Sequence, residues 1–219
     1  MPFLPERIHN MNPIPNKDVR LRSMALNVAG GLFLAVIWLF FAYRHVTAFA
    51  VTGHYALLLF CMSETLQAAL FACRRLPATV SVRPLDWLIA VCGTFAPLFF
   101  VPLNFAWTGA AEVLIVLGVT LQVLGLISLN RSFGLVPARR QIKTSGMYRF
   151  VRHPVYASYL FLFTGYLLGN PSAWNLTVYL FSVSFMLLRI LREEHHLLAD
   201  PEYKRYASRV RYRLVPYLY

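Results

Sequence analysis

The sequence predicts an all-α fold, a polytopic transmembrane helical bundle with both termini in the cytoplasm. Three observations predict it. Of the 219 residues, 58% are hydrophobic and only 14% are charged, whereas soluble domains carry about 25% charged residues. Several apolar runs reach the length of about 20 residues that a helix needs to cross about 30 Å of hydrocarbon. The Lys and Arg residues are concentrated in alternate loops, which is typical of a multi-pass membrane protein.

Four long apolar runs come first, and a helical hairpin follows them. The four runs are Met24–Tyr43, Phe49–Cys73, Leu85–Trp107 and Ala110–Leu129. The arms of the hairpin are Val155–Gly169 and Trp174–Leu191. The fifteen residues of its first arm reach only about 22 Å as a helix, so this arm can be an incomplete span. The sequence therefore predicts five to six crossings.

The distribution of basic residues predicts the orientation. If residues 1–23 are cytoplasmic and every run crosses, the cytoplasmic segments hold 20 of the 21 Lys and Arg residues, and Arg44 alone lies outside. This asymmetry places both termini in the cytoplasm. The net charge of +12 is then mainly a topology signal, with membrane lipids as natural partners. Nucleic acid is not an expected partner, because no recognised binding module accompanies the charge.

Polar residues are concentrated in the loop 130–154 and in the tail from residue 189 onwards. The hairpin between them brings both to the same membrane face. In the first region, Pro154 disfavours helix at His153 and suits the first turn of the helix that follows. Arg152 and His153 are therefore expected at a helix N-terminus, where an anion is favoured. The alternative is that Arg152 anchors the helix to lipid phosphates and His153 caps the turn.

The second polar region continues the last apolar run into the cytoplasm. Glu193 and Glu194 are neighbours, so on a helix they point about 100° apart, and one can face a pocket while the other faces solvent. The alternative is a set of surface pairs, such as Arg189 with Glu193, worth about 0.3–0.5 kcal/mol. A metal site with His195 and His196 is not expected, because adjacent helical histidines diverge and no HExxH pattern is present.

The tail alternates aromatic and basic residues. An interfacial amphipathic segment is one interpretation, and aromatic walls of a pocket for a flat or sulfonium-bearing ligand are the other. Glu64 lies in the middle of the second apolar run, where an ionisable residue is a functional hypothesis by default. The alternative is that Glu64 is protonated and hydrogen-bonded to Gln67 or to a residue of a neighbouring helix. Gln122 is a candidate for that residue.

These polar regions, in this order, resemble the isoprenylcysteine carboxyl methyltransferase family of integral-membrane enzymes, with its bacterial and archaeal relatives. The matching stretches are Ser128–Phe133, Ile142–Tyr148, Arg152–Tyr156, Glu193–Leu197, Tyr203, Tyr206 and Arg213–Pro216. The resemblance covers roughly 128–219. Apolar runs and charge predict a cytoplasmic segment 1–23 and four transmembrane helices in 24–129, and the resemblance implies a catalytic region 130–219.

The resemblance also implies an activity and a site. Such enzymes transfer a methyl group from S-adenosylmethionine, leaving S-adenosylhomocysteine, to a lipophilic or lipidated acceptor, which can be a prenylcysteine-like carboxylate. The catalytic residues carried over are Arg152, Glu193 and Glu194. The cofactor-binding residues carried over are Gly146, Tyr148, His153, Pro154, Tyr156, Leu197, Tyr203, Tyr206 and Arg213. No metal is implied.

Two other functions stay open at this stage. Membrane sterol reductases look related in their C-terminal part, so an NADPH-dependent reductase is one alternative. A non-catalytic lipid-binding protein is the other, in which Glu193 and Glu194 would be freely replaceable. The motifs resemble those of the bacterial relatives. This predicts a multi-pass protein of the bacterial inner (plasma) membrane with its active site facing the cytoplasm.

Overall fold

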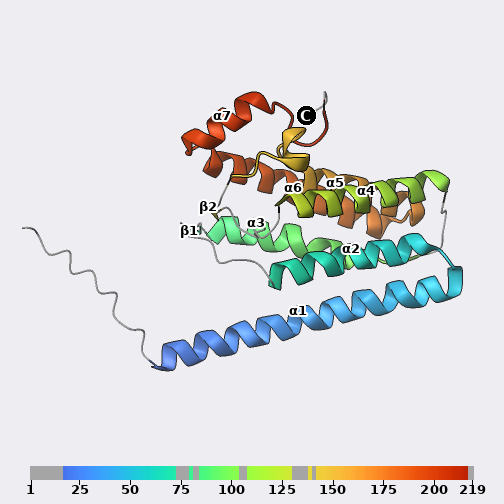
Figure 1. Ribbon diagram of the computed structural model, residues 1–219. Coiled ribbons are helices and arrows are strands. Elements are labelled where there is room, and N and C mark those ends of the chain that lie inside the picture. The colour runs from blue at the N-terminus through green and yellow to red at the C-terminus, as the bar shows by residue number, and fades with distance from the viewer. Residues whose placement is uncertain are drawn as a thin grey trace, which may run out of the picture. The chain divides into compact units, whose positions relative to one another are not determined.

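A computed structural model describes residues 17–72, 79–80, 84–103, 108–129, 138–139 and 142–216. The helices are α1 Lys17–Thr52, α2 Tyr55–Ala72, α3 Pro84–Phe95, α4 Gly109–Leu129, α5 Pro154–Gly169, α6 Ala173–Leu197 and α7 Pro201–Arg209, with 3-10 turns η1 Ala96–Phe99 and η3 Gly146–Arg149 (Figure 1). One two-residue pair, β1 Thr79–Val80 with β2 Ala138–Arg139, is antiparallel. The predicted all-α class is confirmed for these residues. Most of the predicted N-terminal segment, the end of the third apolar run and much of the 130–141 loop lie outside them.

The chain divides into two units, residues 1–39 and 40–219. The first contains the beginning of α1, where Leu32, Phe33 and Val36 are all exposed apolar side chains. Apolar side chains on the outside of a helix are expected where the surrounding medium is lipid. The second unit holds all of the predicted site residues, and the following description concerns it alone.

Three helices in the described part of the chain are long and apolar enough to cross a membrane. They are Leu32–Thr52 within α1, Gly109–Leu129 and Ala173–Leu197. In α6 the apolar stretch ends at Leu191, and the last turns of this helix are polar. The predicted short arm of the hairpin is the 16-residue helix α5.

The sequence prediction places the loop between the first two apolar runs wrongly. The sequence places Arg44 and His45 in a loop, but α1 continues through both and ends at Thr52. The chain turns instead at Gly53, whose φ of 71° is costly for residues with a Cβ. His45 is fully buried, with Nε2 2.8 Å from the Tyr166 hydroxyl and Nδ1 2.8 Å from the Phe41 carbonyl oxygen. This pairing connects α1 to α5 inside an aromatic cluster.

The third predicted run is also not one continuous helix. The α3 helix ends at Phe95 and a 3-10 turn follows, because Pro97 has no N–H to donate and disfavours helix in the residue before it. The backbone beyond this turn is held by two buried side chains of the hairpin turn. Asn175 accepts from the Val101 N–H at 3.0 Å and donates to the Val101 carbonyl at 2.9 Å, and Asn170 accepts from the Leu103 N–H at 3.2 Å. Such pairing is needed wherever non-helical backbone lies among apolar groups.

Helices α4 and α5 lie side by side (Figure 1), and glycines allow their close approach. A Cβ atom on Gly165 would lie 2.9 Å from the Ala111 carbonyl oxygen and 2.8 Å from Ile115 Cγ1. A Cβ atom on Gly118 would lie 2.6 Å from Leu162 Cγ. Small residues at a helix–helix contact are typical of membrane bundles. This packing fixes the position of α5. It therefore also fixes the N-terminal end of α5, where part of the candidate site lies.

Replacing Gly165 by Ala is expected to lower the free energy of unfolding by about 1–3 kcal/mol, because α4 and α5 must separate to accept the methyl group. Thermal unfolding in detergent would measure the change. Gly109→Ala is the matched control, since a Cβ atom there meets nothing within 4 Å. Equal midpoints for Gly165→Ala and the unsubstituted protein would contradict this account of the contact.

Candidate active site

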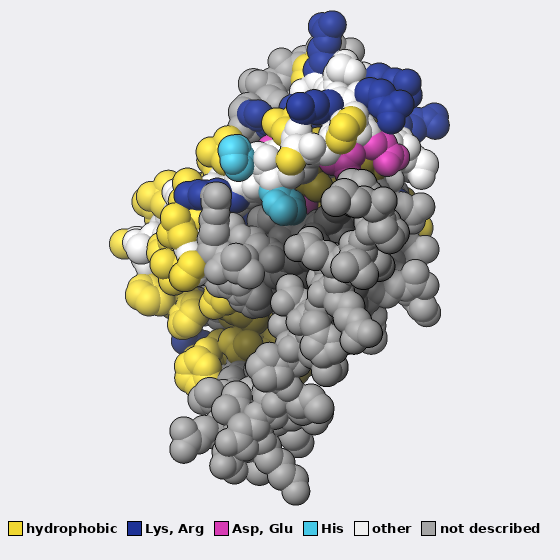
Figure 2. Space-filling view, turned by 90° about the vertical axis from the view of Figure 1, so that its left-hand side faces the viewer, with side chains coloured by type: hydrophobic (Ala, Val, Ile, Leu, Met, Phe, Trp, Pro, Cys, Tyr) yellow, Lys and Arg dark blue, Asp and Glu magenta, His cyan; other side chains and the backbone are white. Residues whose placement is uncertain are grey.

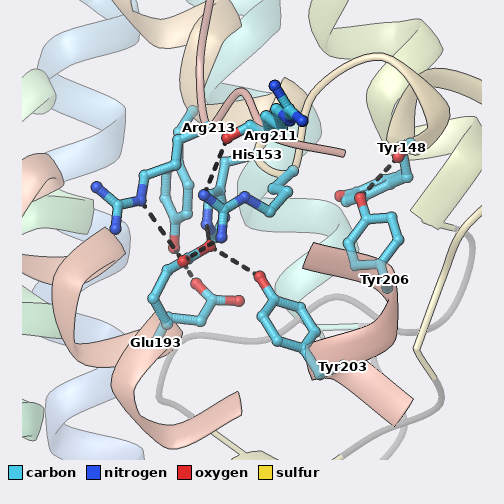
Figure 3. A network of polar contacts seen from close by, with 10 residues as sticks. Tyr148, His153, Glu193, Tyr203, Tyr206, Arg211 and Arg213 are labelled. Atoms are coloured by element: carbon cyan, nitrogen blue, oxygen red, sulfur yellow. Dashed lines mark hydrogen bonds and ion pairs between the residues drawn. The ribbon is translucent and has the colours of Figure 1, made fainter. Parts of the chain in front are cut away.

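Three segments meet at the C-terminal end of α6: the turn before α5, the last turns of α6 itself, and the segment from α7 to Arg213 (Figure 3). As predicted, α5 begins at Pro154, with His153 at the N-cap position. The backbone N–H groups of Arg152 and His153 donate to the carbonyl oxygens of Tyr212 and Arg213 at 2.9 and 2.8 Å. The end of the tail is therefore fixed against the turn that opens α5.

Glu194 is the centre of this arrangement and is buried. Its Oε2 accepts from Arg152 Nη1 at 2.5 Å and lies 3.5 Å from Arg213 Nε. Its Oε1 lies 2.9 Å from His153 Nε2 and accepts from the Tyr203 hydroxyl at 2.8 Å. Figure 3 labels His153, Tyr203 and Arg213, which reach this place from three segments. Three hydrogen bonds and one longer ion pair thus occupy both oxygens of the carboxylate.

The environment keeps Glu194 ionised. Burial by itself raises the pKa of this carboxyl, but the hydrogen bond and charge of His153, the Tyr203 hydroxyl and the Arg152 guanidinium outweigh it and lower the pKa to about 2. Tyr203 shows the opposite effect, because burial and the neighbouring Glu194 charge raise its pKa. Tyr203 is therefore a permanent donor near neutral pH, and Glu194 is a permanent acceptor.

Glu193 has a different environment, as the sequence predicts for neighbours on a helix. It is half-buried and accepts one hydrogen bond in the described structure, from the Tyr156 hydroxyl at 2.9 Å. Glu194 is therefore the inward residue of the pair, and Glu193 lies at the margin of the site. The sequence could not decide between them.

The sequence interpretation missed Arg189. Its guanidinium lies 5.5 Å from the centre of the Tyr156 ring, and its Nη1 donates to Thr94 Oγ1 at 2.9 Å. Arg189 is buried, so it is not the surface partner of Glu193 that one interpretation suggested. The available signal was its position inside the apolar part of α6, where a buried cation calls for a specific partner.

Tyrosines form the wall beside this network. Tyr203 and Tyr206 lie on the inner face of α7 with ring centres 5.6 Å apart, and the Tyr206 hydroxyl donates to the Tyr148 carbonyl oxygen at 2.6 Å. Tyr148, Ile142 and Leu197 pack against them. The α7 helix begins at Pro201, and the Asp200 side chain caps it by accepting from the Glu202 N–H at 2.9 Å.

Gly146 has a local structural role. Its φ is 63°, and a Cβ atom there would lie 2.4 Å from Ser128 Oγ. Ser128 Oγ also accepts from the Met147 N–H at 3.1 Å. Gly146 therefore lets η3 approach the end of α4 and positions Tyr148 beneath α7.

The predicted site residues thus lie together at one end of the second unit, in two groups. Five of them form the ionic network: Arg152, His153, Glu194, Tyr203 and Arg213. The others form its surroundings: Glu193 with Tyr156, and Tyr148 with Tyr206 and Leu197. Gly146 and Pro154 shape the backbone beside them, at η3 and at the start of α5. Glu64 lies outside both groups, where its carboxyl oxygen Oε1 accepts from Gln67 Nε2 at 3.2 Å.

Residues 107–201 match a family model described as phospholipid methyltransferase. The match contains α4, α5 and α6, and therefore Arg152, His153 and both glutamates, while Tyr203 and Arg213 lie beyond it. No curated protein matches the chain. The match covers less than half of the chain and agrees with the resemblance to integral-membrane methyltransferases in that range.

Proposed function

We propose that this chain, in which residues 107–201 match the phospholipid methyltransferase family, is a multi-pass membrane enzyme that transfers a methyl group from S-adenosylmethionine to a lipophilic acceptor. The observation that carries the proposal is the convergence of Arg152, His153, Tyr203 and Arg213 on the buried Glu194. The residues that the family resemblance assigns to cofactor binding and catalysis lie around this network.

The residues present fit a ligand with an ammonium, a carboxylate and a sulfonium group. Glu193 accepts one hydrogen bond within the described structure, so its carboxylate retains capacity for a cation. Arg152 uses Nη1 for Glu194 and Nη2 for the Arg211 carbonyl at 3.1 Å, while its buried Nε has no hydrogen-bond partner in the described part of the chain. Tyrosine rings beside them suit a sulfonium.

In this proposal the two glutamates have different roles. Both oxygens of Glu194 already accept hydrogen bonds, so we assign it to positioning: it fixes Arg152, His153 and the tail. Glu193 is the carboxylate that would contact the cofactor ammonium or ribose. The Tyr156 hydroxyl, which donates to Glu193, holds that carboxylate in one orientation.

When bound, the cofactor supplies a methyl group already activated by its sulfonium. Transfer would join the acceptor to this methyl carbon and leave the C–S electrons on sulfur. The protein has to hold the two reactants in line and exclude water. For this the chain provides the tyrosine wall of α7 on one side and the Tyr156–Arg189 contact on the other.

The acceptor we propose is lipophilic, with an oxygen, nitrogen or sulfur nucleophile. The family resemblance includes a carboxylate among such acceptors. A carboxylate acceptor also needs no proton removal, since its methylation gives a neutral ester.

The orientation we propose follows from the basic residues. All Lys and Arg side chains of α7 and the tail lie at the end of the unit that carries the site, and the sequence asymmetry assigns this end to the cytoplasm. We therefore propose five to six crossings of a bacterial inner membrane, with the site facing the cytoplasm.

Calorimetric titration of the detergent-purified chain with S-adenosylhomocysteine tests the proposal, with NADPH and NADP⁺ in parallel. We expect saturable binding of S-adenosylhomocysteine and none of the nicotinamide cofactors. Binding of NADPH alone would move the protein to the reductases. Binding of neither, in protein shown to be folded, would overturn the enzymatic proposal in favour of a lipid-binding role.

A further inference from the structure

A side of α7 next to the tyrosine wall lines a second feature, a cavity of about 510 Å³. Its lining residues are Thr144, Arg149, Glu202, Arg205, Tyr206, Arg209 and Val210. None of these belongs to the ionic network around Glu194. The volume lies within the range of about 300–1,000 Å³ that small-ligand sites occupy.

The cavity is strongly cationic. Arg205 and Arg209 are four residues apart on α7, so their side chains lie on one face of the helix, and Arg149 comes from η3. Among the described residues, no carboxylate lies within ion-pair distance of any of these three guanidiniums, although Glu202 lines the same cavity. Figure 2 shows Lys and Arg side chains gathered at this end of the second unit.

The apolar side of α7 is not open to a bilayer. Tyr203, Tyr206 and Val210 are buried against Tyr148 and Ile142, so the helix does not insert an apolar face as an interfacial amphipathic segment does. The outer side of α7 carries arginine side chains instead. The ligand that suits this cavity is therefore an anion, recognised through guanidinium groups.

We propose that this cavity binds a phosphate group, and that the phosphate belongs to an anionic phospholipid headgroup. Arginine is the side chain best suited to phosphate, because its planar guanidinium donates two parallel hydrogen bonds to the oxygens. Three guanidiniums from two elements surround one site, and Thr144 adds a hydroxyl donor. The headgroup is the source that the apolar helices favour, since they place the chain in a membrane where anionic headgroups are concentrated.

The test is titration of the full chain in a neutral detergent with short-chain phosphatidate, short-chain phosphatidylcholine and inorganic phosphate. We expect saturable phosphatidate binding that is about tenfold weaker in Arg205→Gln and in Arg209→Gln, the loss of roughly one charge-assisted contact each. Glu202→Gln should bind more tightly, because it removes the one carboxylate of the cavity. Inorganic phosphate binding as tightly as phosphatidate would keep the phosphate site but overturn the headgroup as its source.

Lys204→Gln is the matched control. It removes the same charge from α7 at an exposed position that does not line the cavity. An equal loss in Lys204→Gln and Arg205→Gln, or equal binding of phosphatidate and phosphatidylcholine, would overturn the proposal. Neither measurement involves S-adenosylhomocysteine, so this site and the proposed methyltransferase activity can fail separately.

Discussion

Replacing Glu194 by Gln is expected to lower the free energy of unfolding by about 3–5 kcal/mol, the usual cost of removing one partner of a buried ion pair. The side chain keeps its size, but Arg152 and Arg213 lose the charge of this carboxylate, and one of its two accepting oxygens becomes an NH2 group that faces donors. Thermal unfolding in detergent should show a midpoint lower by roughly 10 °C. The proposed methyltransferase activity should fall with it, because the tail loses its contacts from Tyr203 and Arg213 to this carboxylate.

Glu112→Gln provides the control for that measurement. Glu112 lies in the first turn of α4, half-exposed, and pairs with His54 at 3.5 Å. Surface pairs of this kind contribute about 0–1 kcal/mol, so its midpoint should barely change. Similar midpoints for Glu112→Gln and Glu194→Gln would show that Glu194 is not the organising residue of the site.

The effect of Glu194 should also depend on pH in a defined direction. Its pKa is about 2 in the folded chain, below the ordinary value of 4.5, so its carboxylate stabilises the fold fully above pH 4.5 and progressively less as the pH falls towards 2. The difference in stability between the unsubstituted chain and Glu194→Gln should therefore shrink as the pH falls from 4.5 towards 2. A difference that stays the same over that range would contradict this assignment.

Replacing Glu193 by Gln is expected to abolish most cofactor binding while leaving the fold intact. Glu193 has one hydrogen bond to lose, from Tyr156, so stability should change little. A charge-assisted contact to a ligand ammonium is worth about 1.5–3 kcal/mol, which corresponds to roughly 10- to 100-fold weaker binding of S-adenosylhomocysteine. Calorimetry on the folded variant measures this directly.

Tyr156→Phe separates the positioning of Glu193 from its charge. This variant keeps the ring against Arg189 and the carboxylate on α6, and it removes only the hydroxyl that orients Glu193. Its binding should be weakened by less than that of Glu193→Gln. Unchanged affinity in Glu193→Gln would mean that the cofactor is held without this residue.

Local signals in the sequence were sufficient to predict parts of the site. Pro154 determines where α5 begins, and the polar turn determines where the hairpin reverses, so Arg152 and Glu194 were predicted at the same end. That Glu193 and Glu194 point to different surroundings follows from helix geometry. Which of them faces inward depends on how α6 is rotated against α3 and α5, and packing between distant segments sets that rotation.

The errors have the same physical origin. Arg44 and His45 look like a loop because a charged and a polar residue interrupt an apolar run. His45 stays in the helix because it pairs with Tyr166, 121 residues further along the chain, and no local pattern contains that partner. Arg189 was missed for the same reason, since Thr94 lies on a different helix.

The backbone hydrogen bonds from Arg152 and His153 to Tyr212 and Arg213 also determine when the site can form during biosynthesis. Helices α4 and α5 are synthesised before the ribosome makes these tail residues. Until then the turn before α5 lacks two of its backbone partners, and Glu194 lacks Tyr203 and Arg213. The site can therefore form only after this part of the tail has been made, and the proposed methyltransferase activity should be absent from a nascent chain that lacks it.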